Sequence, residues 1–155
     1  MDAKFREMIA SLAPKFETLI HMHPLKYGNL PRHMPPKAVY LFSDGPTHLY
    51  IGRTNRLRQR LRDHCLKSGT HFTATLAFRI ARHDMGLVRA TYTKTGSRAA
   101  LSDDPEFARS FDAAKQRVAA MDIRYIEETD ATRQALLEIY AATVLGTRFN
   151  DFDTH

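Results

Sequence analysis

Two short β-prone runs separated by a turn-forming segment constrain the fold of this chain more than any other feature of its sequence. Residues 38–42 read Ala-Val-Tyr-Leu-Phe and residues 48–52 read His-Leu-Tyr-Ile-Gly, with Ser-Asp-Gly-Pro at 43–46. This arrangement predicts an antiparallel hairpin with a loop slightly longer than the tightest type. A third run, Ile-Arg-Tyr-Ile-Glu at 123–127, alternates in the same way and predicts one more strand.

Most of the remaining sequence has a helical pattern. Apolar residues at spacings of three and four predict one amphipathic helix over residues 3–21, and a proline-rich connector follows up to residue 36. Further helices are predicted over about 55–66, 71–83, 105–120 and 131–145. The last helix has Asp130 as its N-terminal cap and ends at Gly146. Residues 86–104 are compatible with either a strand or a helix, followed by a polar loop.

These elements predict the α+β fold class, with a small three-stranded antiparallel sheet flanked by helices. We expect two parts in the chain: an N-terminal helix and connector at residues 1–36, and one domain at residues 37–155.

The positive charge of the chain is concentrated in one of these helices. The 155 residues contain 23 Lys and Arg against 17 Asp and Glu, a formal net charge of +6. Residues 53–62 hold five arginines and no acidic residue, so five of the six net charges lie within ten residues. Such a helix favours an anionic partner, nucleic acid first, because arginine suits bidentate phosphate contacts. A solvated charged face is the alternative interpretation.

Composition excludes several other classes of protein. A hydrophobic content of 43% with 26% charged residues is typical of a globular protein rather than a disordered one. No apolar run approaches the roughly 20 residues that cross a bilayer, and the charged N-terminus does not resemble a signal peptide. The single cysteine, Cys65, excludes an internal disulfide and a cysteine-rich zinc site. We therefore expect a cytoplasmic protein without a membrane partner.

The basic helix has a predicted buried stripe beside a predicted polar face. A four-residue spacing assigns to the stripe Leu57, Leu61 and Cys65. The same spacing assigns to the adjacent face Arg56, Arg60 and His64. The first turn of this helix follows the hairpin directly, and its N–H groups would favour an anion there.

A second helix carries an isolated acid. Glu138 is the only charged residue in the run Ala-Leu-Leu-Glu-Ile-Tyr-Ala-Ala-Thr-Val-Leu at 135–145, which predicts a largely buried helix. A buried carboxylate needs an arginine, a set of hydrogen-bond donors or a metal ion. One carboxylate is sufficient for Mg²⁺ if water and phosphate oxygens complete the coordination.

The two predicted strands resemble the signature strands of GIY-YIG nucleases. Val39-Tyr40-Leu41 corresponds to the first signature, although Ala38 and Val39 stand where the family has glycine and isoleucine. Tyr50-Ile51-Gly52 reproduces the second signature literally.

The resemblance continues beyond the hairpin, over about residues 37–152. Arg60 and His64 resemble the Arg-xxx-His helix of the family. Glu138 and Asn150 resemble its glutamate helix and its terminal asparagine. The stretch between His64 and Glu138 is longer than in the smallest family members, so its middle helices and the loop at 91–104 lie outside confident transfer from the family, as do residues 1–36.

Membership would imply a metal-dependent phosphodiesterase that acts on DNA and uses Mg²⁺ or Mn²⁺. By this resemblance, Tyr40 acts as general base with Tyr50 orienting or assisting, although the sequence leaves open which tyrosine is the base. Arg60 would hold the scissile phosphate, and His64 would hydrogen-bond that phosphate or relay a proton. Glu138 would bind the metal ion.

Two further expectations complete the site. Asn150 would orient neighbouring groups. The other arginines of the basic cluster would contact the DNA backbone: Arg53, Arg56, Arg58 and Arg62.

Two other functions remain open from the sequence. The arginine cluster is also what a non-catalytic nucleic-acid-binding module that retains the fold would need. The apolar N-terminal helix could instead dock a protein partner or a second copy of the chain.

Overall fold

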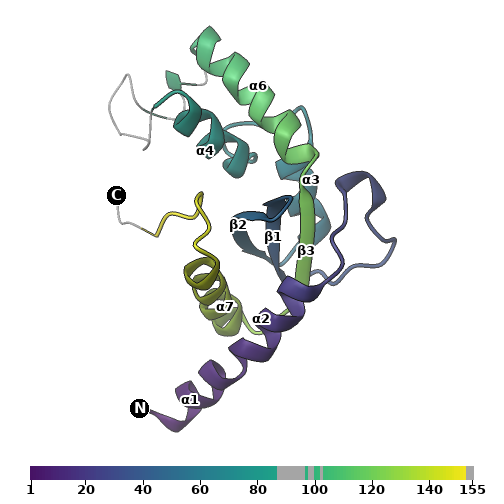
Figure 1. Cartoon of the computed structure of the whole chain (residues 1–155), viewed down its shortest axis with the longest axis vertical. Coiled ribbons are helices and arrows are strands. Elements are labelled where there is room, and N and C mark those ends of the chain that lie inside the picture. The colour runs from purple at the N-terminus through teal and green to yellow at the C-terminus, as the bar shows by residue number, and fades with distance from the viewer. Residues whose placement is uncertain (87–96, 98–99, 102, 153–155) are drawn as a thin grey trace. The chain divides into compact units, whose positions relative to one another are not determined.

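The computed structural model describes residues 1–86, 97, 100–101 and 103–152. The chain forms two compact units. The first comprises Met1–Arg60 and Met121–His155, and the second comprises Leu61–Ala120. Figure 1 labels the helices and strands of both units.

The first unit contains a three-stranded antiparallel sheet, as the sequence predicts. Its strands are β1 (Ala38–Asp44), β2 (Thr47–Thr54) and β3 (Asp122–Glu127), in the order β2-β1-β3. The prediction of a loop slightly longer than the tightest type is wrong, because Asp44 pairs with Thr47 and only Gly45 and Pro46 connect β1 and β2. Gly45 has a φ of +56°, which glycine adopts without strain. A register shift follows Phe42. The α+β class is confirmed.

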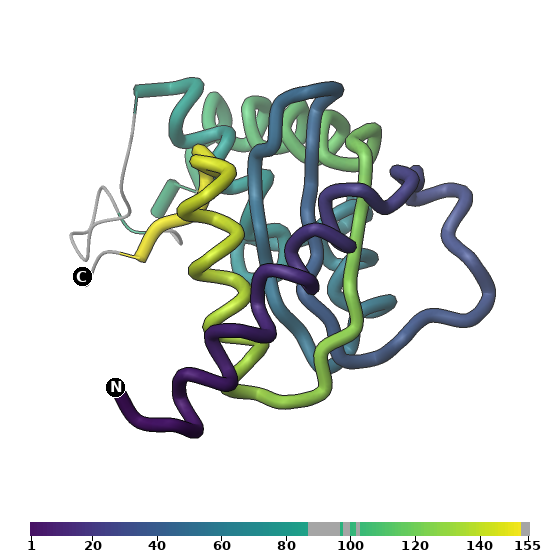
Figure 2. The backbone as a smooth tube through the Cα atoms, turned by 60° about the horizontal axis from the view of Figure 1, so that its bottom comes forward, coloured from purple at the N-terminus to yellow at the C-terminus, as the bar shows by residue number. Residues whose placement is uncertain are grey.

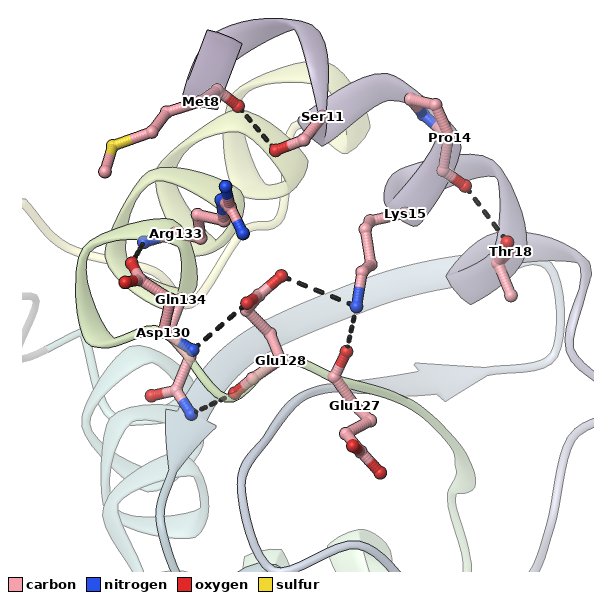
Figure 3. Close-up of polar contacts among 10 residues, drawn as sticks. All are labelled: Met8, Ser11, Pro14, Lys15, Thr18, Glu127, Glu128, Asp130, Arg133 and Gln134. Atoms are coloured by element: carbon pink, nitrogen blue, oxygen red, sulfur yellow. Dashed lines mark hydrogen bonds and ion pairs between the residues drawn. The ribbon is translucent and has the colours of Figure 1, made fainter. Parts of the chain in front are cut away.

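The predicted helix over residues 3–21 is two helices, α1 (Ala3–Ala10) and α2 (Leu12–His21). Pro14 explains the break, because it has no N–H for the carbonyl of Ala10 and its ring crowds that carbonyl. At the junction, the Ser11 hydroxyl donates to the carbonyl of Met8 at 2.6 Å (Figure 3).

Helix α7 (Ala131–Leu145) has the predicted bounds. The Asp130 side chain accepts a hydrogen bond from Arg133 N at 2.8 Å, and Gly146 ends the helix with a φ of +62°. The prediction of burial nearly all round is wrong, because Ile139 and Val144 are 49% and 55% exposed.

The core of the first unit lies between the sheet and two helices. Figure 2 shows α2 and α7 side by side on one face of the sheet. The core side chains come from α2, the two hairpin strands and α7: Leu12, Phe16, Leu19, Val39, Leu41, Ile51, Leu137, Ala141 and Ala142. In contrast, α1 contributes no buried residue.

Polar contacts fix α2 to the connection between β3 and α7 (Figure 3). Lys15 Nζ donates to the carbonyl of Glu127 at 2.5 Å and lies 3.4 Å from Oε2 of Glu128. Glu128 is buried, and its Oε1 accepts a hydrogen bond from Asp130 N at 3.1 Å. The N-terminal segment thus packs on the core of the first unit, while the division at residue 36 stays a prediction.

The connector between α2 and β1 is also held to its unit. It contains a 3₁₀ turn, η1 (Tyr27–Asn29). Leu25 forms a two-bond bridge with Ile123 of β3, at 2.9 and 2.8 Å. The guanidinium of Arg58 donates to the carbonyls of Pro31 and Arg32.

The second unit is helical where it is described. Helix α3 (Leu57–Cys65) begins in the first unit and ends in the second, and its predicted stripe is buried. Helix α4 (Thr75–Asp84) starts four residues later than predicted, and α6 (Pro105–Ala119) has its predicted proline in the first turn. These two helices pack through Phe78, Phe107 and Phe111. Most of the ambiguous segment at 86–104 lies outside the described residues.

Within the described part of the chain, no helix is long and apolar enough to cross a membrane.

Candidate active site

The two tyrosines of the predicted site lie on neighbouring strands. In the hairpin register Tyr40 pairs with Gly52, and Tyr50 pairs with Phe42. Side chains of a strand alternate between faces, so Tyr40 and Tyr50 leave the same face of the sheet. Their ring centroids are 6.2 Å apart, and both side chains are buried.

Gly52 determines where the ring of Tyr40 lies. A Cβ atom at position 52 would stand 2.3 Å from both Cζ and Oη of Tyr40. The phenol ring of Tyr40 therefore lies directly over the backbone of β2, in space that a side chain at position 52 would occupy. The glycine of the second signature, Gly52, thus allows the tyrosine of the first signature, Tyr40, to pack against β2.

Arg60 reaches this tyrosine from the first turn of α3. Its Nε donates to the Tyr40 hydroxyl at 3.3 Å. Burial raises the pKa of Tyr40 above its ordinary value, the nearby Tyr50 and Glu138 raise it further, and Arg60 opposes them without prevailing. The Tyr40 hydroxyl consequently keeps its proton at neutral pH.

Arg60 stays positively charged in this environment. Burial disfavours its charged form, but the hydroxyls of Tyr40 and Tyr50 outweigh that effect, and the pKa of Arg60 is raised. The site therefore combines a fixed positive charge with two phenol groups.

Glu138, the isolated acid of α7, forms an ion pair with Arg53, so an arginine is one of its partners. Arg53 Nε lies 3.0 Å from Oε2 of Glu138, and the carboxylate side chain is 20% exposed. Arg53 faces Val39 in the register, so it leaves the sheet on the face that α7 covers. The Arg53–Glu138 pair and Tyr40 thus lie on opposite faces of the hairpin, and Glu138 is still near enough to raise the pKa of Tyr40.

Glu138 is also the residue that could hold a divalent cation. In the ranges that the structure describes, no three His, Cys, Asp or Glu side chains gather into a metal-binding group. A single carboxylate nevertheless fits Mg²⁺, which often takes one or two protein carboxylates and completes its shell with water and phosphate oxygens. The donor chemistry fits the ion, and the metal itself stays a prediction.

Asn150 contacts the backbone of β2. Ile51 N donates to its Oδ1 at 2.9 Å, and its Nδ2 donates to the carbonyl of Ile51 at 2.8 Å. The hydroxyl of Thr147 donates to the same Oδ1 at 2.7 Å, and Phe149 N donates to the carbonyl of Leu49 at 3.0 Å. Asn150 therefore pairs with the edge of β2 between Tyr50 and Gly52, and a catalytic role for it stays a prediction.

Comparison with protein families matches residues 36–142 to the GIY-YIG catalytic domain. The chain belongs to the GIY-YIG family. The resemblance inferred from the signature strands is confirmed. Comparison with curated proteins and with solved structures gives no match.

GIY-YIG domains are generally endonucleases, so the family assigns the chain a nuclease-type function with DNA as its substrate. The matched residues include both tyrosines, Arg60, His64 and Glu138, whereas Asn150 lies beyond them.

Two of the four arginines predicted to contact the DNA backbone have partners within the protein. Arg53 is engaged with Glu138, and Arg58 holds the connector. Arg56 and Arg62 are exposed. Their DNA contacts stay predictions.

His64 belongs to the second unit and is completely buried. This burial distinguishes it from Arg56, which is exposed although it shares the same predicted helix face. Its assignment to the catalytic site stays a prediction.

One residue near the site was missed from the sequence. Gln134 is buried, and its Nε2 donates to the carbonyls of Glu128 and Thr54 and to Oδ1 of Asn55, at 2.7, 3.3 and 3.3 Å. It lies one turn before Glu138 and ties α7 to the end of β2. The available signal in the sequence was its position: Gln134 precedes Glu138 by four residues, so both lie on the same side of the predicted helix.

Proposed function

We propose that the protein is a metal-dependent endonuclease that hydrolyses DNA phosphodiester bonds, with tyrosine-assisted attack of water and Glu138 binding one Mg²⁺ or Mn²⁺ ion. The observation that supports this most is the 3.3 Å contact between Arg60 Nε and the Tyr40 hydroxyl, beside the ring of Tyr50. It combines a phosphate-binding cation with two groups that can orient or transfer a proton.

In this mechanism Arg60 binds the scissile phosphate and stabilises the charge that develops on its oxygens. Tyr40 is a neutral phenol beside Arg60, so it orients the attacking water by hydrogen bonding. It would accept the proton of water only as a phenolate, after its own proton had passed to solvent, and further positive charge beside it would favour that loss by lowering its pKa. Tyr50 is the second candidate for this base.

Glu138 would hold the cation through its carboxylate. A bound divalent ion supplies Lewis acidity, which neutralises the phosphate and lowers the pKa of the attacking water. Arg53 lies at the same carboxylate, so it orients Glu138 and must share it with the ion.

A non-catalytic DNA-binding module is the second candidate, and two observations favour it. Glu138 is already neutralised by Arg53, and the raised pKa of Tyr40 disfavours a phenolate. The salt dependence of DNA affinity measures how many arginines contact phosphate groups. Five contacts give a log–log slope of about −4.5, and three give about −2.7 if Arg53 and Arg58 keep their internal contacts.

The decisive experiment follows nicking of supercoiled plasmid, and cleavage of duplex, flap, branched and single-stranded DNA, with Mg²⁺, Mn²⁺ or EDTA. Glu138→Gln keeps the shape of the side chain and removes its charge, and we expect it to lose at least about 100-fold in rate. Glu7→Gln, on the exposed part of α1, is the matched control and should nick at the wild-type rate.

The endonuclease proposal fails if no substrate is cut in any metal, or if Glu138→Gln nicks as fast as wild type. Salt-sensitive binding that persists in Glu138→Gln without cleavage would establish the binding module instead. Circular dichroism of each variant checks that it is folded.

A further inference from the structure

The turn before α4 exposes an aromatic side chain. Phe72 is 75% exposed, far more than the other phenylalanines of the second unit, which form its core. Exposing a phenyl ring forfeits the stabilisation that burial would give it. An exposed ring of this kind is available to contact a ligand.

Phe72 is held in place rather than carried on a loose loop. Thr70 N donates to the hydroxyl of Thr73 at 2.9 Å, and Phe72 N donates to the hydroxyl of Thr70 at 3.3 Å. Two backbone bonds, from Thr73 N and Ala74 N to the carbonyl of Thr70, close the turn at 3.1 and 2.8 Å. The exposed ring is therefore preorganised, and a ligand does not have to order the turn.

A second ring supports Phe72 from behind. The ring centroids of His71 and Phe72 are 4.0 Å apart with a tilt of 41°. The centroid of His71 lies 6.5 Å from that of Phe78 in the aromatic core of this unit. Three rings thus lead from the core to the surface, and Phe72 presents the last of them to solvent.

The sequence around Phe72 is basic. Between Asp63 and Asp84 it contains no Asp or Glu. Of its cations, Lys67 is exposed and Arg79 is half-buried, whereas Arg82 is buried. A positive segment with an exposed aromatic ring is the combination by which proteins bind unpaired nucleic acid, with cations on phosphates and rings on bases. A protein hot spot would instead place the ring within an apolar surface, whereas the neighbours of Phe72 in the turn are Thr70, His71 and Thr73.

We propose that Phe72 is a stacking site for an unpaired nucleobase of the DNA substrate, so that the protein prefers DNA with a bulged, flapped or single-stranded base. This inference rests on the proposed function, because it names a class of substrate for the same nuclease. Stacking on one aromatic side chain is worth roughly a 10- to 100-fold gain in affinity.

The absence of tryptophan from the sequence provides a direct probe. In Phe72→Trp the new indole should be quenched when single-stranded DNA or a duplex with one unpaired base is added, and unaffected by a fully paired duplex. Phe5→Trp, at a position 42% exposed on α1, is the matched control and should not respond to either DNA.

Affinity provides the second measurement, by fluorescence anisotropy of labelled DNA in EDTA, where cleavage does not contribute. Phe72→Ala should bind bulged DNA about 10-fold more weakly than wild type and paired DNA within 2-fold. Equal losses on both DNAs, or no quenching in Phe72→Trp, would overturn the stacking site. Quenching without metal-dependent cleavage would support the stacking site and refute the endonuclease.

Discussion

Replacing Gly52 by alanine adds one methyl group where the ring of Tyr40 already lies. The new Cβ would stand 2.3 Å from Cζ and Oη of that ring and 2.9 Å from Cε1. Non-bonded carbon atoms prefer a separation of about 3.5–4.0 Å, so the ring must retreat by at least about 1.2 Å. Overpacking of this kind in a close-packed core costs about 1–3 kcal/mol.

Two quantities should change together. A loss of about 2 kcal/mol lowers the Tm of a chain of 155 residues by about 4–8 °C. The hydroxyl of Tyr40 is 3.3 Å from Arg60 Nε, and a further retreat of about 1.2 Å ends that hydrogen bond. Misplacement of a catalytic group by about 1 Å costs about 100-fold in rate, which plasmid nicking at a temperature well below the Tm would measure.

Gly28→Ala is the matched control, because a Cβ there meets no atom within 4 Å. The same Gly52→Ala change in a Tyr40→Leu background should cost less by about 1 kcal/mol or more, since leucine has no atoms where the ring clashes. The reasoning is refuted if both glycine variants melt alike, or if Tyr40→Leu leaves the cost of Gly52→Ala unchanged.

Three other predictions follow from contacts of single residues. Asn150→Ala leaves the N–H and carbonyl of Ile51 without their side-chain partners and should cost about 1–3 kcal/mol in urea denaturation, and an unchanged midpoint would contradict this. Gln134→Met removes three hydrogen bonds at similar volume and should cost about 1–3 kcal/mol, against no measurable cost for Gln116→Met on the exposed surface of α6. Burial raises the pKa of the Cys65 thiol from 9.0 to about 12, so the folded protein keeps a proton that the unfolded chain loses. The stabilisation is therefore complete below pH 9 and is lost between pH 9 and 12, and Cys65→Ala should show a shallower fall in its urea midpoint over that range.

The bounds of a helix could be predicted from the sequence where a single capping residue determines each end. Asp130 and Gly146 bound α7 because a carboxylate caps the first turn and only glycine readily takes the left-handed conformation at the end. The break at Ser11 was missed because the apolar periodicity continues through it, whereas the effect of Pro14 falls on a carbonyl four residues earlier. The late start of α4 was missed because hydroxyl groups of Thr70 and Thr73 hold a turn that apolar spacing does not reveal.

The candidate site was predictable where one helix or hairpin brings residues together. The sequence placed the first turn of α3 directly after the hairpin, and in the structure Arg60 of that turn contacts the Tyr40 hydroxyl. The pairing of Glu138 with Arg53 could not be chosen from the sequence, because an arginine, hydrogen-bond donors and a metal ion all satisfy a lone carboxylate. The contacts of Asn150 depend on which strand forms the edge of the sheet, and that follows only from the order β2-β1-β3.

Both outer strands of the sheet, β3 and β2, form hydrogen bonds with residues from other segments of the chain. Leu25 pairs with Ile123 on β3, and Phe149 and Asn150 pair with β2. An uncovered strand edge is a template on which a second molecule can add a strand, and this is a route to domain-swapped and fibrillar assemblies. The connector before β1 and the segment after α7 therefore protect a small sheet against self-association, in addition to any part they have in DNA cleavage.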